Sequence, residues 1–363
     1  MTSILFECHH LYYLPNFLPI IEEFQQRGGY SLSASIPHII NDLERRHLCE
    51  AVETVGIEFI DGDNEATRQA ELRSRKFDVV IVGIPGMLEK VVSDNTVAVM
   101  VYHGIGLKES YYRDNSPRIN IRTVESQERY DELTRRGETN LVLTGYTKID
   151  PLASTNSQKN NQFLETLDLS PERPTLLYAP TFYPSSVEQV LPKLPGLAQG
   201  MNVIIKLHGF SWSQRRYKHH SEQAKQIAGQ GIYLATREDY NIVPYYLVSD
   251  ILLSDISSTL FEYLALDRPI IQTTFYKPRL KHRILKSRLR KRLDLARTEK
   301  INFTQRLDHP EELEALVSKT VKNPDSMSRM RQEAADHYLY RTDGKASVRL
   351  VDAIEEQWDK DRR

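Results

Sequence analysis

The sequence lacks the features that mark disulfide-rich, membrane-spanning and secreted proteins. Among 363 residues it has only two cysteines, Cys8 and Cys49, which are too few for a disulfide framework. No apolar run approaches the roughly 20 residues that a membrane-spanning helix needs. The first residues contain no basic region and carry Glu7 early, unlike a secretory signal peptide. We therefore expect a cytoplasmic protein.

The charge and the missing motifs exclude further classes. Lys and Arg number 48 against 49 Asp and Glu, so the net charge of −1 gives no reason to expect nucleic acid as a partner. The adjacent histidines at 9–10 and 219–220 have no further ligand at a metal-binding spacing, so we expect no metal site. Walker A, G-x-G-x-x-G and G-x-S-x-G motifs are missing, which argues against P-loop NTPases, dinucleotide-dependent redox enzymes and α/β-hydrolases. We expect no cofactor.

Short apolar runs alternate with helical patterns along the chain and predict an α/β fold. Strands are predicted at 4–6, 30–34, 57–60, 77–82, 97–102, 122–124 and 141–144, and again at 175–178, 203–206, 232–235, 251–253 and 269–272. Helices are predicted at 17–26, 41–55, 65–75 and 259–266. This alternation is typical of doubly wound parallel sheets, which bind ligands at the carboxyl ends of their strands.

A polar stretch without periodicity, residues 150–162, divides the pattern into two halves, and we interpret it as a linker. The predicted organisation is an N-terminal Rossmann-like domain at 1–150, a C-terminal Rossmann-like domain at 163–340, and a final helix at 341–363 that packs back on the N-terminal domain. Two such domains in series place a cleft between the carboxyl ends of their sheets.

Residues 250–272 carry the strongest sign of a binding site. Ser257, Ser258 and Thr259 follow a predicted strand and begin a helix, and a helix start attracts anions because its N–H groups lack partners. Glu262 lies one turn further on, where a carboxylate can accept hydrogen bonds from ribose hydroxyls. An ordinary Ser/Thr helix cap with a solvated Glu gives the same pattern, so this stretch alone does not distinguish a binding site from a simple cap.

Other polar groups follow predicted strands or lie near the C-terminus. Lys206 and His208 are two residues apart at a strand end, which places both side chains on one face. Histidines, cations and hydroxyls gathered at strand ends suit a nucleotide-diphosphate ligand. The candidates outside residues 250–272 are His103, Lys108, Thr181, Lys206, His208, Lys345 and Arg349.

Together these motifs resemble the CDP-glycerol glycerophosphotransferase family, the teichoic-acid and capsule-type polyol-phosphate transferases. The matching stretches are YHGIGLK, TGYTKID, YAPTF, IIKLHG, DILLSDISSTLFEYLALDRPII and DGKASVRLVDAI, in the family's order from about residue 100 to about residue 355. The resemblance implies the GT-B fold, in which two Rossmann-like domains face a central cleft. The N-terminal domain would then be the acceptor side, and the C-terminal domain would bind the nucleotide donor.

The resemblance also implies a reaction. A hydroxyl of a cell-envelope glycan or a lipid-linked acceptor attacks the β-phosphate of a CDP-polyol, and CMP leaves. CDP-glycerol is the expected donor. His103 is implied as the base, while His208 and Lys206 would hold the pyrophosphate and ease the departure of CMP.

The remaining candidates receive binding roles from the same resemblance. Glu262 would hold the ribose. The residues implied to contact phosphate are Lys108, Thr181, Ser257, Ser258, Thr259, Lys345 and Arg349. Lys345 and Arg349 could also contact the acceptor. Two alternatives stay open. One is a GT-B glycosyltransferase that uses a CMP- or UDP-linked sugar in surface polysaccharide synthesis, and the other is a binding protein without turnover.

Residues 277–292 interrupt the α/β pattern with nine Lys and Arg and no acid. Apolar residues fall on one helical face, which is typical of a helix that lies on a membrane surface or binds a polyanion; they are Leu280, Ile284, Leu285, Leu289 and Leu293. A solvated helix or loop at the edge of the cleft is the ordinary alternative. The hypothesis is that this segment docks the protein on anionic lipid, at the inner face of the cell membrane, or on an anionic polymer.

Reversing five of the basic charges in residues 277–292 should therefore reduce co-sedimentation with anionic vesicles, because attraction to an anionic surface grows with each cation. Uncharged vesicles serve as the control. Unchanged co-sedimentation of the variant would contradict lipid binding by this segment.

Overall fold

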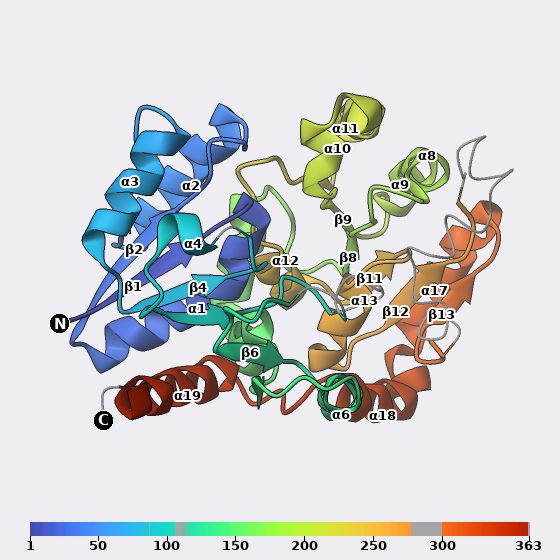
Figure 1. The fold of residues 1–363 in the computed structure, drawn as a ribbon. Coiled ribbons are helices and arrows are strands. Elements are labelled where there is room, and N and C mark those ends of the chain that lie inside the picture. Colours follow the sequence, from blue (N-terminus) through green and yellow to red (C-terminus); the bar gives the residue numbers. More distant parts are fainter. Residues whose placement is uncertain (87, 106–111, 113–114, 277–299, 362–363) are drawn as a thin grey trace, which may run out of the picture. The chain divides into compact units, whose positions relative to one another are not determined.

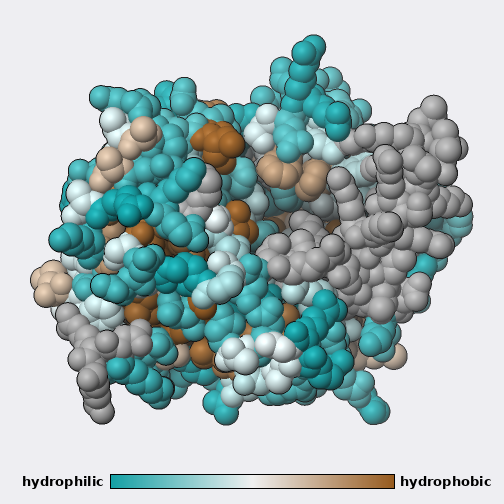
Figure 2. All heavy atoms as spheres, in the orientation of Figure 1, coloured by the Kyte–Doolittle hydropathy of each residue, from teal (hydrophilic) through white to brown (hydrophobic). Residues whose placement is uncertain are grey.

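The computed structural model describes residues 1–86, 88–105, 112, 115–276 and 300–361. Lys108 and the basic segment at 277–292 lie outside these residues. The chain divides into two compact units, the first drawn from Met1–Gly104, Ser110–Pro151 and His337–Arg363 and the second from Ile105–Glu109 and Leu152–Asp336 (Figure 1). None of the helices in the described ranges has both the length and the apolar composition that crossing a membrane requires. Hydrophilic residues cover most of the face drawn in Figure 2.

The first unit is built on seven parallel strands in the order β3-β2-β1-β4-β5-β6-β7. The strands are β1 (Thr2–Glu7), β2 (Tyr30–Ser35), β3 (Glu58–Phe59), β4 (Val79–Val82), β5 (Val97–Met100), β6 (Ile121–Val124) and β7 (Leu141–Leu143). The helices are α1 (Leu14–Arg27), α2 (Asp42–Thr54), α3 (Glu65–Arg75), α4 (Leu88–Val91), α6 (Gln127–Arg135) and α19 (Ala346–Asp361). Strands β4, β5 and β6 are buried along their whole length, as expected where helices cover both faces of a parallel sheet.

The second unit is built on six parallel strands in the order β10-β9-β8-β11-β12-β13. The strands are β8 (Thr175–Tyr178), β9 (Asn202–Ile205), β10 (Ile232–Leu234), β11 (Ile251–Ser254), β12 (Ile270–Thr273) and β13 (Gln305–Leu307). The helices are α7 (Ser157–Thr166), α8 (Val187–Val190), α9 (Leu194–Leu197), α10 (Gly209–Ser213), α11 (Lys218–Ile227), α12 (Val243–Val248), α13 (Thr259–Glu262), α17 (Leu313–Lys322) and α18 (Ser328–Tyr338). Its core joins the inner strands to α8, α9 and α17.

Both sheets follow the strand order of the Rossmann fold. Counted along the chain, each sheet has its first strand beside its fourth, so that β1 pairs with β4 and β8 pairs with β11. At this switch point the connections leave the sheet in opposite directions, which opens a crevice at the carboxyl ends of the two strands. The prediction of an α/β chain with two doubly wound parallel sheets is confirmed.

Residues 150–162, expected to be an irregular linker, contain regular structure. A 3-10 helix covers Thr147–Ala153, and α7 begins at Ser157. The Asn156 side chain caps α7 by accepting a hydrogen bond from the Lys159 N–H at 3.0 Å. The apolar residues of α7 come only in its second half, so the polar first half shows no helical periodicity.

Strand β13 was not predicted, because the sequence that forms it is short and polar. Only its last residue, Leu307, is buried. The strand lies at the edge of the second sheet and pairs with β12. An edge strand has a neighbour on one side only, so it need not be apolar along its length, and sequence periodicity gives no signal.

Helix α19 packs on α1 inside the first unit, where Arg27 joins the two helices. The guanidinium of Arg27 donates to Glu355 at 2.8 Å, to Asp352 at 2.7 Å and to the Val348 carbonyl at 3.3 Å. It also pairs with Glu23 on its own helix at 2.7 Å. Several bonds to one half-buried guanidinium stabilise more than an isolated surface pair does.

Arg27→Ala should loosen α19 from α1 by about 1–2 kcal/mol, because the variant loses the charge-assisted bonds to Glu355 and Asp352. Amide hydrogen exchange in α19 should then be roughly 10-fold faster, as measured by mass spectrometry. Arg329→Ala is the control, because the ion pair of Arg329 with Glu333 is exposed on the surface. Equal exchange of α19 in Arg27→Ala and the wild type would contradict this role.

Candidate functional site

The predicted phosphate-binding residues of the second unit gather at one edge of its sheet. Thr181 follows β8, and residues 255–259 follow β11, so both flank the switch point between these strands. Lys206 and His208 follow β9, which is the other neighbour of β8. Three adjacent strands thus deliver these candidates to the same carboxyl edge, where α/β folds bind their ligands.

Asp255, which was not among the candidates, joins the two loops of the switch point. Its fully buried carboxylate accepts hydrogen bonds from the Thr181 N–H at 2.7 Å, the Ser186 N–H at 3.1 Å and the hydroxyls of Ser185 and Ser186 at 3.1 and 3.2 Å. Burial raises the pKa of Asp255 to about 6, although these bonds act in the opposite direction. The signal in the sequence is a single acid directly after a buried strand.

The hydroxyl-bearing loop is bonded largely to the protein itself. Thr259 Oγ1 lies 2.9 Å from Ser254 Oγ, and Ser258 Oγ donates to Glu262 Oε1 at 3.0 Å. Ser257 Oγ accepts from the Thr259 N–H at 3.3 Å, so the proton of that hydroxyl can serve a ligand oxygen. The contacts of these three residues with phosphate stay predictions.

Glu262 is fully buried at the end of α13, rather than solvated as an ordinary helix cap would leave it. The Tyr246 hydroxyl donates to its Oε2 at 2.9 Å, while the Ser258 hydroxyl donates to its Oε1. These bonds compensate for the loss of water around the carboxylate. Its role in binding ribose stays a prediction.

His208 is the N-cap residue of helix α10 and has a defined ring orientation. Its Nδ1 accepts a hydrogen bond from the Phe210 N–H at 3.1 Å, so the neutral ring carries its proton on Nε2. The ring contacts Phe182, with centroids 4.7 Å apart. Lys206 and His208 were expected to share one face of a strand. Strand β9 ends at Ile205, before both residues, so the alternation of side chains along a strand does not apply to them. Nε2–H is a donor suited to a phosphate oxygen.

His103 lies at the corresponding edge of the first sheet, after β5, where its ring packs against two tyrosines. The ring centroids of Tyr12 and Tyr13 are 5.3 and 4.5 Å from that of His103. Tyr13 crosses the end of β4 so closely that a Cβ on Gly83 would lie 1.8 Å from its ring. Glycine is therefore required at position 83, and the tyrosine that supports His103 is fixed against the sheet.

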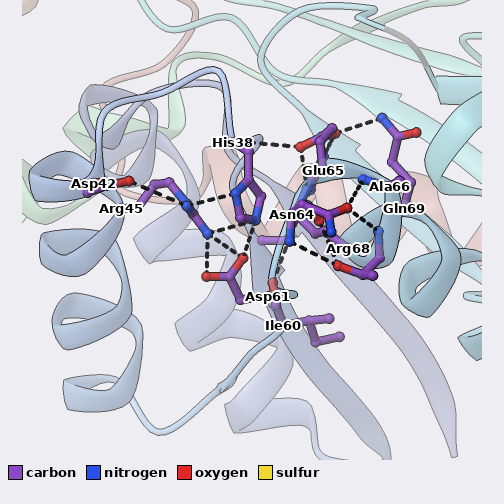
Figure 3. A network of polar contacts seen from close by, with 12 residues as sticks. His38, Asp42, Arg45, Ile60, Asp61, Asn64, Glu65, Ala66, Arg68 and Gln69 are labelled. Atoms are coloured by element: carbon purple, nitrogen blue, oxygen red, sulfur yellow. Dashed lines mark hydrogen bonds and ion pairs between the residues drawn. The ribbon is translucent and has the colours of Figure 1, made fainter.

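A polar network holds the carboxyl ends of β1, β2 and β3 together. Figure 3 shows its centre, where Arg68 on α3 donates to Glu65. Arg68 also reaches buried Glu7 at the end of β1, at 3.0 Å, and Ser35 at the end of β2, at 2.8 Å. In the same view Arg45 on α2 bonds both His38 and Asp61. The carboxyl ends of β1, β2 and β3 are thus polar and held together by hydrogen bonds and ion pairs.

Lys345 and Arg349 belong to the first unit, whereas Thr181, Lys206, His208 and residues 255–259 belong to the second. Asp150 caps α19 by accepting from the N–H groups of Ala346 and Ser347 at 3.0 and 2.7 Å. Arg349 Nε donates to the Thr144 carbonyl at 2.7 Å, and its Nη1 donates to Asp343. These bonds join the matching stretches at 144–150 and 343–349, so they give Arg349 a structural function. Its contact with phosphate or acceptor stays a prediction.

A polar loop at the switch point of a Rossmann-type sheet is typical of nucleotide-binding α/β proteins. The sequence model of the family described as CDP-glycerol:poly(glycerophosphate) glycerophosphotransferase matches residues 124–356, more than half of the chain. The chain therefore belongs to this family and is a transferase. The resemblance inferred from the motifs is confirmed.

Solved structures show the same fold. The wall teichoic acid polymerase TagF has a TM-score of 0.69 and 17% identity over 99% of this chain and 89% of that chain. A TagF variant soaked with CDPG has a TM-score of 0.68 at the same identity and coverage. A putative UDP-N-acetylglucosamine 2-epimerase from Listeria monocytogenes has a TM-score of 0.63 and 13% identity over 99% of this chain and 97% of that chain. The search of curated proteins gave no match.

Asp255→Ala should destabilise the second unit by about 2–4 kcal/mol, because it leaves the donors of half-buried Thr181 and of buried Ser185 and Ser186 without an acceptor. It should also weaken binding of CDP-glycerol, since the two loops are no longer held. Urea unfolding and calorimetric titration measure the two effects.

Asp250→Ala is the matched control for this test. The Asp250 carboxylate also accepts a hydrogen bond from a backbone N–H, that of Thr175, at 2.8 Å. Asp250, however, lies at the amino end of β11, opposite to the edge that carries the candidate site. This variant should bind CDP-glycerol like the wild type. If Asp255→Ala did so too, Asp255 would have no part in organising the site.

Proposed function

We propose that the protein transfers glycerol phosphate from CDP-glycerol to a hydroxyl of a cell-envelope glycan or a lipid-linked acceptor, releasing CMP. Membership of the glycerophosphotransferase family supports the donor. The main structural support is the gathering of Thr181, His208 and residues 255–259 at the ends of three adjacent strands. We take an envelope polymer as the acceptor class because TagF is a wall teichoic acid polymerase.

In the proposed reaction the acceptor oxygen attacks the phosphorus that bears glycerol. A new P–O bond forms, the bond to the CMP oxygen breaks, and CMP departs with the bonding electrons. The acceptor proton passes to His103, the proposed base. Its position at a strand end, against Tyr12 and Tyr13, holds the imidazole in one orientation, which a general base requires.

The second unit would stabilise the pyrophosphate. His208 would donate from Nε2 to a phosphate oxygen, because Nδ1 already accepts from the Phe210 N–H. Lys206, Thr181 and the hydroxyl of Ser257 would supply the other positive or donor groups. Asp255 would position Thr181 without touching the ligand, since its carboxylate is buried behind that residue's N–H.

The decisive experiment measures CMP release from CDP-glycerol, CDP-ribitol, a CMP-linked sugar and UDP-sugars, with ³¹P NMR of the product. Release from a CDP-polyol with formation of a phosphodiester is expected. His103→Asn should lower turnover roughly 10²–10⁴-fold, the usual contribution of a general base. His47→Asn, a half-buried histidine on α2, is the matched control and should keep wild-type turnover.

Other outcomes separate the alternatives. A glycoside product from a nucleotide sugar would keep the fold and replace the reaction. Donor binding without release, with envelope polymers offered as acceptors, would favour a binding protein. Wild-type turnover in His103→Asn would remove that residue from the role of base.

A further inference from the structure

Helices α8 and α11 bring two histidines and a carboxylate together in the second unit. His219 Nε2 lies 3.2 Å from Glu188 Oε1, and His220 Nε2 lies 3.4 Å from the same oxygen. One ligand atom from each residue lies within 4.8 Å of the other two. The adjacent histidines showed no further ligand in the sequence, because the fold supplies it from 31 residues upstream.

The two distances, recorded here as ion pairs, also suit a metal site. A charge-assisted N–H···O bond is usually about 2.7–2.9 Å long, and both separations here are longer. Ligand atoms around tetrahedral Zn²⁺, each roughly 2.0–2.1 Å from the ion, lie about 3.3 Å from one another. The spacing between Glu188 and each histidine therefore fits an ion placed among them.

His220 is also oriented as a ligand would be. It is only 2% exposed, and its Nδ1 lies 3.1 Å from Ser211 Oγ on α10. When Nδ1–H donates to Ser211, the lone pair of Nε2 points towards Glu188 and His219. Ligating histidines are usually held in this way by a partner on the second ring nitrogen.

We propose that Glu188, His219 and His220 bind one Zn²⁺-type ion, with water in the fourth position. Two imidazoles and one carboxylate are a donor set that Zn²⁺ accepts. The side chains of Glu188 and His219 are 31% and 46% exposed, so the ion can enter and keep a water ligand on that side. The same exposure makes the site accessible in the folded protein.

The ion would act as a clamp beside the donor site. Helix α8 directly follows Ser185 and Ser186, which bond Asp255, while α11 follows the segment that begins with His208. Tyr217, just before α11, has its ring 5.2 Å from that of Phe182 and 5.9 Å from that of His220. Linking α8 to α11 would therefore fix both loops. This role rests on the proposed function, whereas binding of the ion does not.

Titration of the tag-free, chelator-treated protein with Co²⁺ tests the site directly. One equivalent should give the visible absorption of tetrahedral Co²⁺, and Zn²⁺ should displace it. Ser211→Ala should weaken the affinity roughly 10–100-fold, as loss of an outer partner does. His219→Gln should weaken it further. This variant changes a half-exposed residue, so it should fold like the wild type.

His47→Gln is the control, because His47 forms a single pair with Glu50 in the first unit. It should bind Co²⁺ like the wild type. Absence of the Co²⁺ bands, or equal binding by His219→Gln and the wild type, would overturn the site. Zn²⁺ should raise the unfolding temperature of the wild type but not of His219→Gln. Unchanged affinity for CDP-glycerol with and without Zn²⁺ would overturn the clamp while leaving the site.

Discussion

The candidate donor site depends on one buried carboxylate. Removing a charged group from water is costly unless hydrogen bonds replace its hydration, and Asp255 has four such bonds. Their donors lie in the segment from Thr181 to Ser186, so this segment cannot move away without leaving the carboxylate unsatisfied. The strand order makes β8 and β11 neighbours, and Asp255 then fixes the loops that follow them.

The edges of the two sheets carry different chemistry on the same topology. In the first unit, arginine–carboxylate pairs such as Arg68–Glu7 connect the ends of β1 to β3, and His103 lies among aromatic rings. In the second unit the edge offers hydroxyls, backbone N–H groups and the Nε2–H of His208. The residue proposed as the base, His103, lies in the first environment. Stabilising phosphate charge suits the second.

The sequence predicted those parts of the fold that leave a local signal. Strands such as β4 and β11 are buried along their length and read as continuous apolar runs, and α3 begins with a cap formed by Asn64. The polar edge strand β13 and the polar first half of α7 leave no such signal. Asp255 and Glu188 were missed for another reason. Their partners are far away in the chain, and only the tertiary fold brings them together.

The buried state of Glu262 constrains how Ser258 and Glu262 can act together. Ser258 has one hydroxyl proton, and in this structure it goes to Glu262. If that hydroxyl turns to a phosphate oxygen, the carboxylate loses one of its donors, while Tyr246 retains the other oxygen. A buried carboxylate needs a replacement donor, and a ribose hydroxyl is of the right kind. If both roles predicted from the resemblance hold, they are coupled: a nucleotide that supplies phosphate and ribose would exchange this bond, whereas free phosphate would leave Glu262 with one donor fewer.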